Sequence, residues 1–451
     1  MGGIISNILW WQWGLVIGSS LLLLWWSPLA KTAEAFFSAK VGKKSPNWII
    51  LTGSLVISWV FAKSITNAAD LGNRFGVVGG LAYAAYYLSF IVAGIVIYFM
   101  RVRGGFNSIH EFLKTRYGKS ALIVFSVIIA FRLFNEVWSN TMVIGSYFGE
   151  AGSGSYYWAI IVFTFLTLLY ALKGGLNSSI FSDAVQMVLF AVLLAIILFI
   201  LLGDESTAAS ELISEGSFSW STGLNLLFAA VIQSLSYPFH DPVLTDRGFI
   251  SSPKTTIRSF LIAGLVGGLC IFLFSFLGIY AGVKGMSSGN LMAVASLFGT
   301  VMLLLINFIM IVSAASTLDS SFAAFSKLVA IDLNGGNTLK FGRITMILVA
   351  VLGTIPVFFD PEILSATTVS GTMVIGLAPV FLFWWLSAPT LSFMLAVGVG
   401  IFCGIVLAID AVPRWMVWTE GPYADLLWMN LFGIILCTIV FFIPIGLFKK
   451  E

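Results

Sequence analysis

The chain has 451 residues, of which 59% are hydrophobic and 10% are charged, and its formal net charge is +3. A soluble globular domain carries roughly 25% charged residues, so composition excludes a soluble protein and predicts one that is embedded in a lipid bilayer. The weak, dispersed positive charge does not indicate a nucleic-acid partner, and we expect none.

Residues that support catalysis or tight metal binding are sparse. The three cysteines, Cys270, Cys403 and Cys437, lie in separate apolar runs and indicate neither a disulfide framework nor a zinc site. The only histidines are His110 and His240, and no nucleophile–base or metal-ligand spacing accompanies them. We therefore expect a protein that is not an enzyme.

Apolar runs long enough to cross a bilayer, about 20 residues each, follow one another along the whole chain. They are predicted to be helices, because lipid offers no partner to backbone groups outside a helix or a closed barrel. No basic residue precedes Lys31, so we expect the first run to be a retained span and not a signal peptide. Thirteen spans are predicted, at 8–28, 47–69, 76–99, 119–147, 154–172, 179–203, 221–244, 258–283, 296–330, 341–358, 364–386, 390–411 and 425–447.

Lysine and arginine are unevenly distributed between alternating loops. One set of loops carries eighteen of the 23 basic residues, whereas the other set carries only Arg74, Lys284 and Arg414. Cytoplasmic loops are enriched in basic residues, so the first set is predicted to be cytoplasmic. We expect a multi-pass protein of the cell membrane (inner or plasma) with its N-terminus outside and its C-terminus in the cytoplasm.

The order of the spans indicates an internal symmetry. Between the first span and the last two, ten spans form two groups of five with opposite topology, an arrangement typical of secondary transporters. The predicted organisation is an extra N-terminal helix with a cytoplasmic loop (1–46), a first repeat (47–203), a second repeat (204–388) and two extra C-terminal helices (389–451).

A few charged residues lie inside the spans, where each costs about 2.5–3.5 kcal/mol on insertion scales and usually marks a functional position. A helix rise of about 1.5 Å per residue places Lys63 of the second span and Glu136 of the fourth at similar depth. We expect either a structural ion pair between them or a role in substrate contact or proton coupling.

The seventh span ends in the sequence SYPFHDP, residues 236–242. Pro238 and Pro242 remove backbone donors and clash with the preceding turn, so this span is predicted to be discontinuous. In lipid such a break persists only where it lines a cavity or is buried in protein. His240 and Asp241 are then predicted to face a central cavity opposite the second span, with Lys63 or a cationic substrate group as the partner of Asp241; alternatively, they emerge among the cytoplasmic headgroups.

The ninth span contains the sequence SAASTLDSS, which places several hydroxyls and one carboxylate on barely two helical turns. Hard cations prefer several oxygen ligands, at least one of them anionic, so this face is a candidate cation site. Alternatively, the hydroxyls bond to preceding carbonyls or serve as small packing residues. The hydroxyls that share one helix face are Ser313, Ser316, Thr317 and Ser320.

Four segments together resemble the sodium:solute symporter family, which includes sodium/galactose, sodium/proline and sodium/sialic acid symporters. The similarity runs from about residue 34 to 333. It implies a LeuT-type fold with a five-plus-five inverted repeat. The segments are NSIHEFLKTRYG (107–118), GGLNSSIFSDAVQ (174–186), TDRGFISSPK (245–254), and STLDSS (316–321) followed by AIDL (330–333).

The resemblance also implies residues for sodium, which is the only metal that we expect. A principal site takes carbonyls from the second span and oxygens from the ninth, and some members have a second site. Asp319 stands where hydroxyl residues are usual. The implied sodium-binding residues are Ile57, Val60, Ser313, Ser316 and Thr317, with Asp183, Asp319, Ser316 and Ser320 at the second site.

The substrate-contacting positions differ from those of the sugar carriers. Trp59 and Asp241 stand where the sodium/galactose symporters have asparagines, so we expect a small charged or zwitterionic solute in place of a sugar. The expected substrate-binding residues are Trp59, Lys63, Ser64, Glu136, Tyr237, His240 and Asp241.

These observations predict a secondary active transporter that takes up a small polar or charged organic solute together with sodium by alternating access. Lys63 favours an alternative, since a fixed cation repels sodium by about 1 kcal/mol at 4 Å in bulk water and by more at a lower effective dielectric constant. The alternative is a proton-coupled or ion-independent transporter of the same fold. A membrane sensor or assembly subunit that does not transport is a further alternative.

Overall fold

The computed structural model describes residues 2–37, 45–205, 207–287, 289, 291–333, 335–359 and 365–448. Every regular element in these residues is a helix, which confirms the all-α prediction. Ten helical segments of the described chain are long and apolar enough to cross a membrane, and Trp48–Trp59 and Leu224–Gln233 are shorter apolar helices. The chain is therefore an all-helical, multi-pass membrane protein, and the count of thirteen spans stays a prediction.

The orientation of the chain also stays a prediction. Several of the basic residues on which it depends, including Lys40, Lys43 and Lys44 of the first loop, lie outside the described residues.

The described helices group into two compact units, each assembled from three stretches of the chain. Unit 1 comprises Met1–Val77, Leu133–Glu215 and Leu273–Pro361, and unit 2 comprises Val78–Arg132, Gly216–Phe272 and Glu362–Glu451. Each unit draws on both predicted repeats, and the repeat boundaries themselves stay predictions. Three helical segments contribute to both units, namely α4 (Ala62–Ala84), α6 (Ile109–Ser146) and α12 (Pro253–Val283). In α4 and α6 two helices meet at a kink, at Gly76 and Gly118 respectively.

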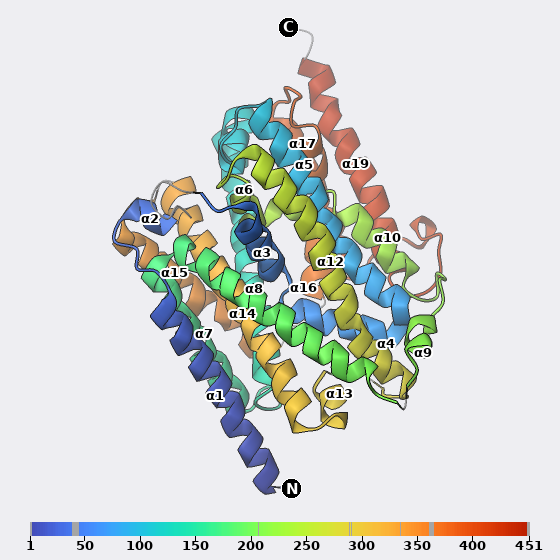
Figure 1. The fold of residues 1–451 in the computed structure, drawn as a ribbon. Coiled ribbons are helices and arrows are strands. Elements are labelled where there is room, and N and C mark those ends of the chain that lie inside the picture. Colours follow the sequence, from blue (N-terminus) through green and yellow to red (C-terminus); the bar gives the residue numbers. More distant parts are fainter. Residues whose placement is uncertain are drawn as a thin grey trace. The chain divides into compact units, whose positions relative to one another are not determined.

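Unit 1 is built around α14 (Thr300–Lys327), which packs against α1 (Gly2–Trp26), α7 (Gly154–Gly174), α8 (Leu176–Leu202) and α15 (Leu339–Thr354) (Figure 1). Every residue of α14 from 309 to 324 is buried, so this helix is enclosed around its whole circumference. The remaining elements of unit 1 are α2 (Ala33–Phe37), α3 (Trp48–Trp59), α9 (Ala209–Ser214), α13 (Leu291–Leu297), η3 (Leu328–Asp332) and η4 (Ile355–Phe359).

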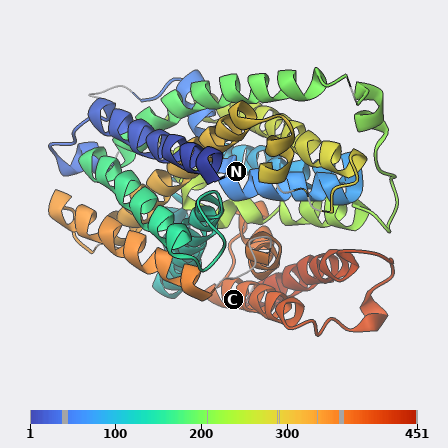
Figure 2. The ribbon, with the colours of Figure 1, turned by 90° about the horizontal axis from the view of Figure 1, so that it is seen from below.

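Unit 2 contains α18 (Thr390–Ala408) and α19 (Ala424–Phe448), which lie side by side in the red part of the chain (Figure 2). Gln233 joins α19 to other elements of the unit, because its amide nitrogen donates to the Asn430 side chain at 3.2 Å and its oxygen accepts from the Tyr86 hydroxyl at 2.8 Å. The remaining elements are η1 (Ala85–Tyr87), α5 (Leu88–Val102), α10 (Leu224–Gln233), η2 (Tyr237–His240), α11 (Pro242–Arg247), α16 (Ser365–Met373), α17 (Leu377–Leu382) and η5 (Arg414–Met416).

Three predicted spans are broken helices in the structure. The break that the prolines predict in 221–244 is confirmed, since α10, η2 and α11 follow one another there. The spans predicted at 47–69 and 364–386 are not single helices either, because the first is divided between α3 and α4 and the second between α16 and α17.

Glycine lets α4 and α12 approach one another closely within unit 1. A Cβ added at Gly278 would lie 1.7 Å from the carbonyl oxygen of Ala69, and one added at Gly72 would lie 2.3 Å from that of Ser275. Small residues allow helix backbones to touch in membranes, where packing drives association. The contact between α4 and α12 therefore depends on the absence of side chains at both glycines.

We predict that Gly278→Ala destabilises the protein by about 1–3 kcal/mol, the usual cost of forcing extra atoms into a packed interior. Thermal unfolding in detergent measures this change. Gly398→Ala on α18 is the control, because no atom lies within 4 Å of a Cβ at that position. Equal unfolding temperatures for the two variants would contradict the close approach.

Candidate functional site

The second predicted span contains a helix break: α3 ends at Trp59, and α4 begins at Ala62. Val60 lies between them with a backbone conformation (φ −79°, ψ 68°) outside the helical range. The carbonyls of the last helical turn, which includes Ile57, lack the partner that a continuing helix would supply. The Ser313 hydroxyl donates to the Val60 carbonyl, so α14 meets this broken end.

Further hydroxyl groups of α14 lie next to this contact and make hydrogen bonds of their own. The Thr317 hydroxyl donates to the Ser313 carbonyl at 3.0 Å, which is the backbone-directed bond that the sequence left as an alternative. The Ser316 hydroxyl donates to Oδ1 of Asp183 on α8 at 2.6 Å. The structure thus gathers Val60, Ser313 and Thr317 into one chain of oxygens, with Ser316 turned toward α8.

Two buried carboxylates lie on the packed faces of α8 and α14. Asp183 accepts hydrogen bonds from the hydroxyls of Ser54 at 2.5 Å and Ser316 at 2.6 Å. Asp319 accepts one from the Ser182 hydroxyl at 2.6 Å.

A further serine bond joins these helices beside the carboxylates, between the hydroxyls of Ser179 and Ser320 at 2.9 Å. The packing of α8 on α14 therefore brings together all four residues of the predicted second site, Asp183, Ser316, Asp319 and Ser320. We use the name carboxylate cluster for the two aspartates and the serines that donate to them, namely Ser54, Ser182, Asp183, Ser316 and Asp319.

The carboxylate cluster can accommodate a positive charge. Serine hydroxyls are neutral donors, so they satisfy hydrogen bonds of the carboxylates without removing their charge. Two carboxylates that share one site repel each other unless a cation or a proton is shared between them. The arrangement is therefore suited to bind a small cation or to hold a proton.

Sequence reasoning missed two of the serines that donate to the carboxylates, Ser54 and Ser182, whereas Ser316 was predicted. Ser182 precedes Asp183 directly, yet its hydroxyl bonds to Asp319 on the other helix. Ser54 lies 129 residues before Asp183 in the chain and reaches it through the packing of α3 on α8. The serine-rich sequence around Asp183 was the only signal for Ser182, and nothing in the sequence pointed to Ser54.

Unit 1 contains the ion pair between Lys63 and Glu136 that was predicted from their similar depth in the membrane. Lys63 Nζ lies 2.7 Å from Glu136 Oε1, and the two side chains are 1% and 3% exposed. Lys63 Nζ also donates to Asn135 at 3.2 Å, and Asn140 donates to Glu136 Oε2 at 3.0 Å. Asn135 and Asn140 were not predicted, although Asn140 lies one turn after Glu136 on α6 and so shares its face.

The two other predicted residues of this region lie around the helix break. Trp59 is the last residue of α3, and its ring centroid lies 6.2 Å from that of Phe61. The backbone nitrogen of Ser64 donates to the Phe61 carbonyl at 2.9 Å. Both side chains are buried.

Asp241 has two distinct roles within unit 2. Its Oδ1 accepts from the backbone nitrogens of Val243 and Leu244, at 2.9 and 3.2 Å, and so caps α11, whose first residue is Pro242. Its Oδ2 lies 3.3 Å from Arg132. Arg132 of the same unit is therefore a cation partner of Asp241 that the sequence did not predict, and the expected pairing with Lys63 or a substrate group stays a prediction.

Tyr237 and His240 lie beside this pair. The Arg132 guanidinium lies 5.3 Å from the centroid of the Tyr237 ring, and His240 Nδ1 lies 2.5 Å from the Tyr237 carbonyl. His240 and Asp241 are each 2% exposed, so the alternative that placed them in water among the headgroups is wrong. Their predicted position opposite Trp59, Lys63 and Ser64 stays a prediction.

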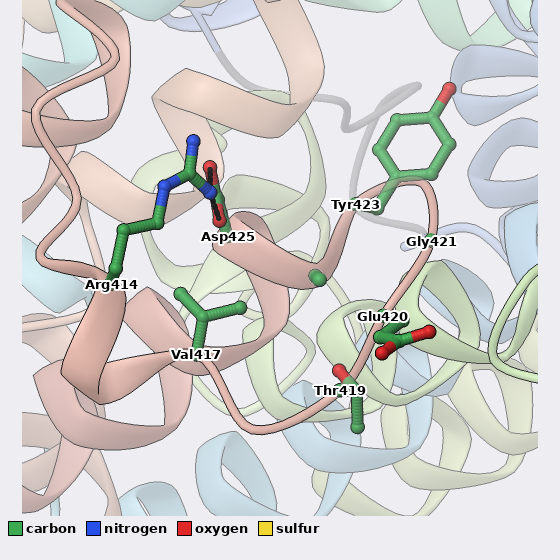
Figure 3. A pocket seen from close by; sticks show the side chains of 8 residues that line it. Arg414, Val417, Thr419, Glu420, Gly421, Tyr423 and Asp425 are labelled. Atoms are coloured by element: carbon green, nitrogen blue, oxygen red, sulfur yellow. Dashed lines mark hydrogen bonds and ion pairs between the residues drawn. The ribbon is translucent and has the colours of Figure 1, made fainter.

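An open pocket of about 450 Å³ lies elsewhere in unit 2, in the segment before α19 (Figure 3). Arg414 and Asp425 form an ion pair there at 3.3 Å, but the Arg414 side chain is 84% exposed. Exposed pairs contribute little, and none of the predicted site residues lines this pocket. It is not the candidate site.

No group of three or more histidine, cysteine, aspartate or glutamate residues in the described chain could hold a metal ion. The carboxylate cluster has only two acidic residues and is otherwise formed by serine hydroxyls. Such oxygen ligands suit a hard cation.

Part of the sequence matches the model of a known family, and two relatives have detectable sequence similarity. Residues 41–237 match the model of the sodium:solute symporter family. The probable urea active transporter 3 of Schizosaccharomyces pombe is 22% identical over 244 residues, which cover 48% of this chain and 36% of the relative. The sodium/glucose cotransporter 4 of Mus musculus is 23% identical over 217 residues, which cover 47% of this chain and 30% of the relative. The matched segments thus span about a third of the length of these relatives.

Two solved structures share the fold. A sodium-coupled sialic acid symporter, captured in a substrate-bound outward-open state, superposes with a TM-score of 0.73 at 16% identity over 98% of each chain. The transporter MhsT in complex with L-phenylalanine superposes with a TM-score of 0.59 at 13% identity over 89% of this chain and 99% of that chain. The chain therefore has the fold of the LeuT-fold transporters, and over residues 41–237 its resemblance to the sodium:solute symporter family is confirmed.

Proposed function

We propose that the chain is a secondary active transporter that couples uptake of a small polar or charged organic solute to sodium by alternating access. The fold and the family resemblance support transport. Two of the relatives, a probable urea active transporter and a sodium/glucose cotransporter, support small polar solutes as the substrate class. The lipid bilayer, sodium and the solute are its proposed partners.

The observation that carries this proposal is the contact between Ser313 and the broken end of α3. A carbonyl released by a helix break in lipid requires a polar partner, and here Val60 finds it in a hydroxyl-rich helix. A sodium ion bound there would be coordinated by oxygen atoms of both α3 and α14, in place of that hydrogen bond. We propose that Ile57, Val60, Ser313, Ser316 and Thr317 form this principal sodium site.

Proton coupling is the second candidate, and the carboxylate cluster favours it. Asp319 adds a second carboxylate on the packed faces of α8 and α14: Ser182 of α8 donates to Asp319, and Ser316 of α14 donates to Asp183. A proton held by this pair neutralises one charge, as a sodium ion would. We therefore propose that Asp183, Asp319, Ser316 and Ser320 hold either a second sodium or a transported proton.

The substrate is proposed to carry no large net charge. Lys63 and Glu136 already neutralise each other, as do Arg132 and Asp241. A solute with both positive and negative groups, or with amide groups, can exchange hydrogen bonds with either pair without leaving a buried charge unpaired. Trp59, Lys63, Ser64, Glu136, Tyr237, His240 and Asp241 remain the proposed substrate-binding residues.

Solute-induced thermal stabilisation tests the function, because a ligand stabilises the state that it binds. We predict that a zwitterionic or amide solute raises the unfolding temperature and that sodium strengthens this effect. Thr317→Ala should weaken the sodium response by about 1.5–3 kcal/mol, the value of a hydrogen bond to a charged group.

The matched control is Thr141→Ala on α6, since Thr141 is also buried and its hydroxyl bonds to the Val137 carbonyl of its own helix at 2.9 Å. A sodium titration that is identical in wild type and Thr317→Ala would refute the sodium assignment. Absence of any solute effect across a broad library, with or without sodium, would refute transport itself.

Asp319→Asn tests whether a proton competes with the cation. We predict that the wild type binds sodium less tightly as the pH falls, because protons and sodium compete for the carboxylate cluster. Asp319→Asn should remove this dependence. The control is Asp332→Asn on η3, where the carboxylate instead pairs with Lys327 at 3.5 Å. The same pH dependence in wild type and Asp319→Asn would show that Asp319 is not the carboxylate at which protons compete with the cation.

The Lys63–Glu136 pair is predicted to be strongly coupled. Lys63→Met or Glu136→Gln alone should each destabilise the protein by about 3–5 kcal/mol, because each leaves a buried charge without its partner. The double variant should lose less than the sum of the two. Chemical or thermal unfolding measures these differences, and Arg414→Met, at an exposed pair, should have little effect. Additive losses would contradict the pairing.

A further inference from the structure

A second cavity lies within unit 1, between α1, α8 and α14, with a volume of about 400 Å³. Half of its fourteen lining residues belong to α1, and the others come from α8 and α14. The lining is almost entirely apolar, with Leu22, Val185 and Phe308 as examples from the three helices. No residue of the carboxylate cluster and none of the proposed substrate residues lines it.

Two glycines hold this space open. Gly14 and Gly18 lie four residues apart on α1 and both line the cavity. A Cβ added at either position would meet no atom within 4 Å. This differs from the glycines at which α4 and α12 touch, such as Gly278, where the partner backbone fills the space. On α1 the glycines therefore leave room for a separate molecule.

One polar side chain in the lining has unused hydrogen-bonding groups. Gln186 on α8 is 1% exposed and lies beside Tyr170 of α7, but neither its amide oxygen nor its nitrogen has a hydrogen-bond partner within 3.5 Å among the described residues. Ser19, also in the lining, is satisfied because its hydroxyl donates to the Leu15 carbonyl at 2.7 Å. Buried polar groups are normally paired, so Gln186 indicates an occupant that offers it a hydrogen bond.

The depth of Gln186 restricts that occupant. Gln186 lies ten residues after the start of α8 at Leu176, which corresponds to about 15 Å of helix rise. The hydrocarbon layer is about 30 Å thick, so the amide lies near its middle. The ester groups of ordinary phospholipids lie at the edge of this layer and do not reach it. The occupant is therefore a molecule that dissolves in the hydrocarbon itself.

We propose that this cavity binds a neutral, largely apolar small molecule with a single hydrogen-bonding group, of the alkylphenol class, which enters from the bilayer. The apolar lining binds its ring and alkyl chain, and Gln186 binds its hydroxyl. The exposed apolar residues of α1, such as Leu21 and Trp25, place this helix against lipid. The proposal does not rest on the transport function.

A photoreactive probe tests the site on the full chain in lipid nanodiscs. An alkylphenol that carries a diazirine is activated by light, and mass spectrometry identifies the labelled peptides. We expect label on the facing segments of α1, α8 and α14, and competition by the same alkylphenol without the diazirine. Gly18→Leu should lower this labelling at least tenfold, and Gly18→Ala, which adds fewer atoms, should lower it less.

Two further variants complete the test. Gly398→Leu on α18, which also has no atom within 4 Å of its Cβ, should leave the labelling unchanged. Gln186→Leu should weaken alkylphenol competition by about 3- to 10-fold, the worth of one neutral hydrogen bond, and should not weaken competition by the matching alkylbenzene.

Label that is spread evenly over lipid-facing helices, or that is unchanged in Gly18→Leu, would overturn the site. Equal affinity of wild type and Gln186→Leu for the alkylphenol would overturn the proposed role of the amide.

Discussion

The hydrogen bond from Ser313 to the Val60 carbonyl is the contact on which the candidate site depends. A helix that breaks inside a bilayer releases backbone groups that lipid cannot satisfy, so the break after Trp59 requires a polar surface next to it. The hydroxyl-rich part of α14 provides that surface. The same requirement explains why α14 is buried around its whole circumference, since a polar helix facing lipid would be costly.

The small side chains of α14 have two physical effects at once. Serine and alanine allow α7, α8 and α15 to approach closely, and the serine hydroxyls then reach carboxylates on a neighbouring helix. Because those hydroxyls are neutral, packing satisfies the hydrogen bonds of Asp183 and Asp319 but leaves their charge to be balanced. Close packing and affinity for a positive charge thus arise from the same residues.

The sequence predicted the features that nearby residues determine. It missed the features that depend on contacts between distant segments of the chain. Composition and hydropathy gave the all-helical membrane class, and Pro238 and Pro242 gave the break before α11. The break after Trp59 has no proline or glycine to signal it, because Ser313 and other distant residues stabilise it. Helix rise predicted the Lys63–Glu136 pair, whereas the pairing of Arg132 with Asp241 depends on how distant segments of unit 2 pack together.

The two carboxylate oxygens of Asp241 have separate partners, one in the backbone of α11 and the other in Arg132. Asparagine retains an oxygen that can cap a helix but replaces the other oxygen by an NH₂ group, which repels a guanidinium. Alanine removes both contacts. An alanine substitution alone would therefore combine the loss of the α11 cap with the loss of the Arg132 charge pair. Comparison of the alanine and asparagine variants of Asp241 would separate the effect of the helix cap from the effect of the charge pair.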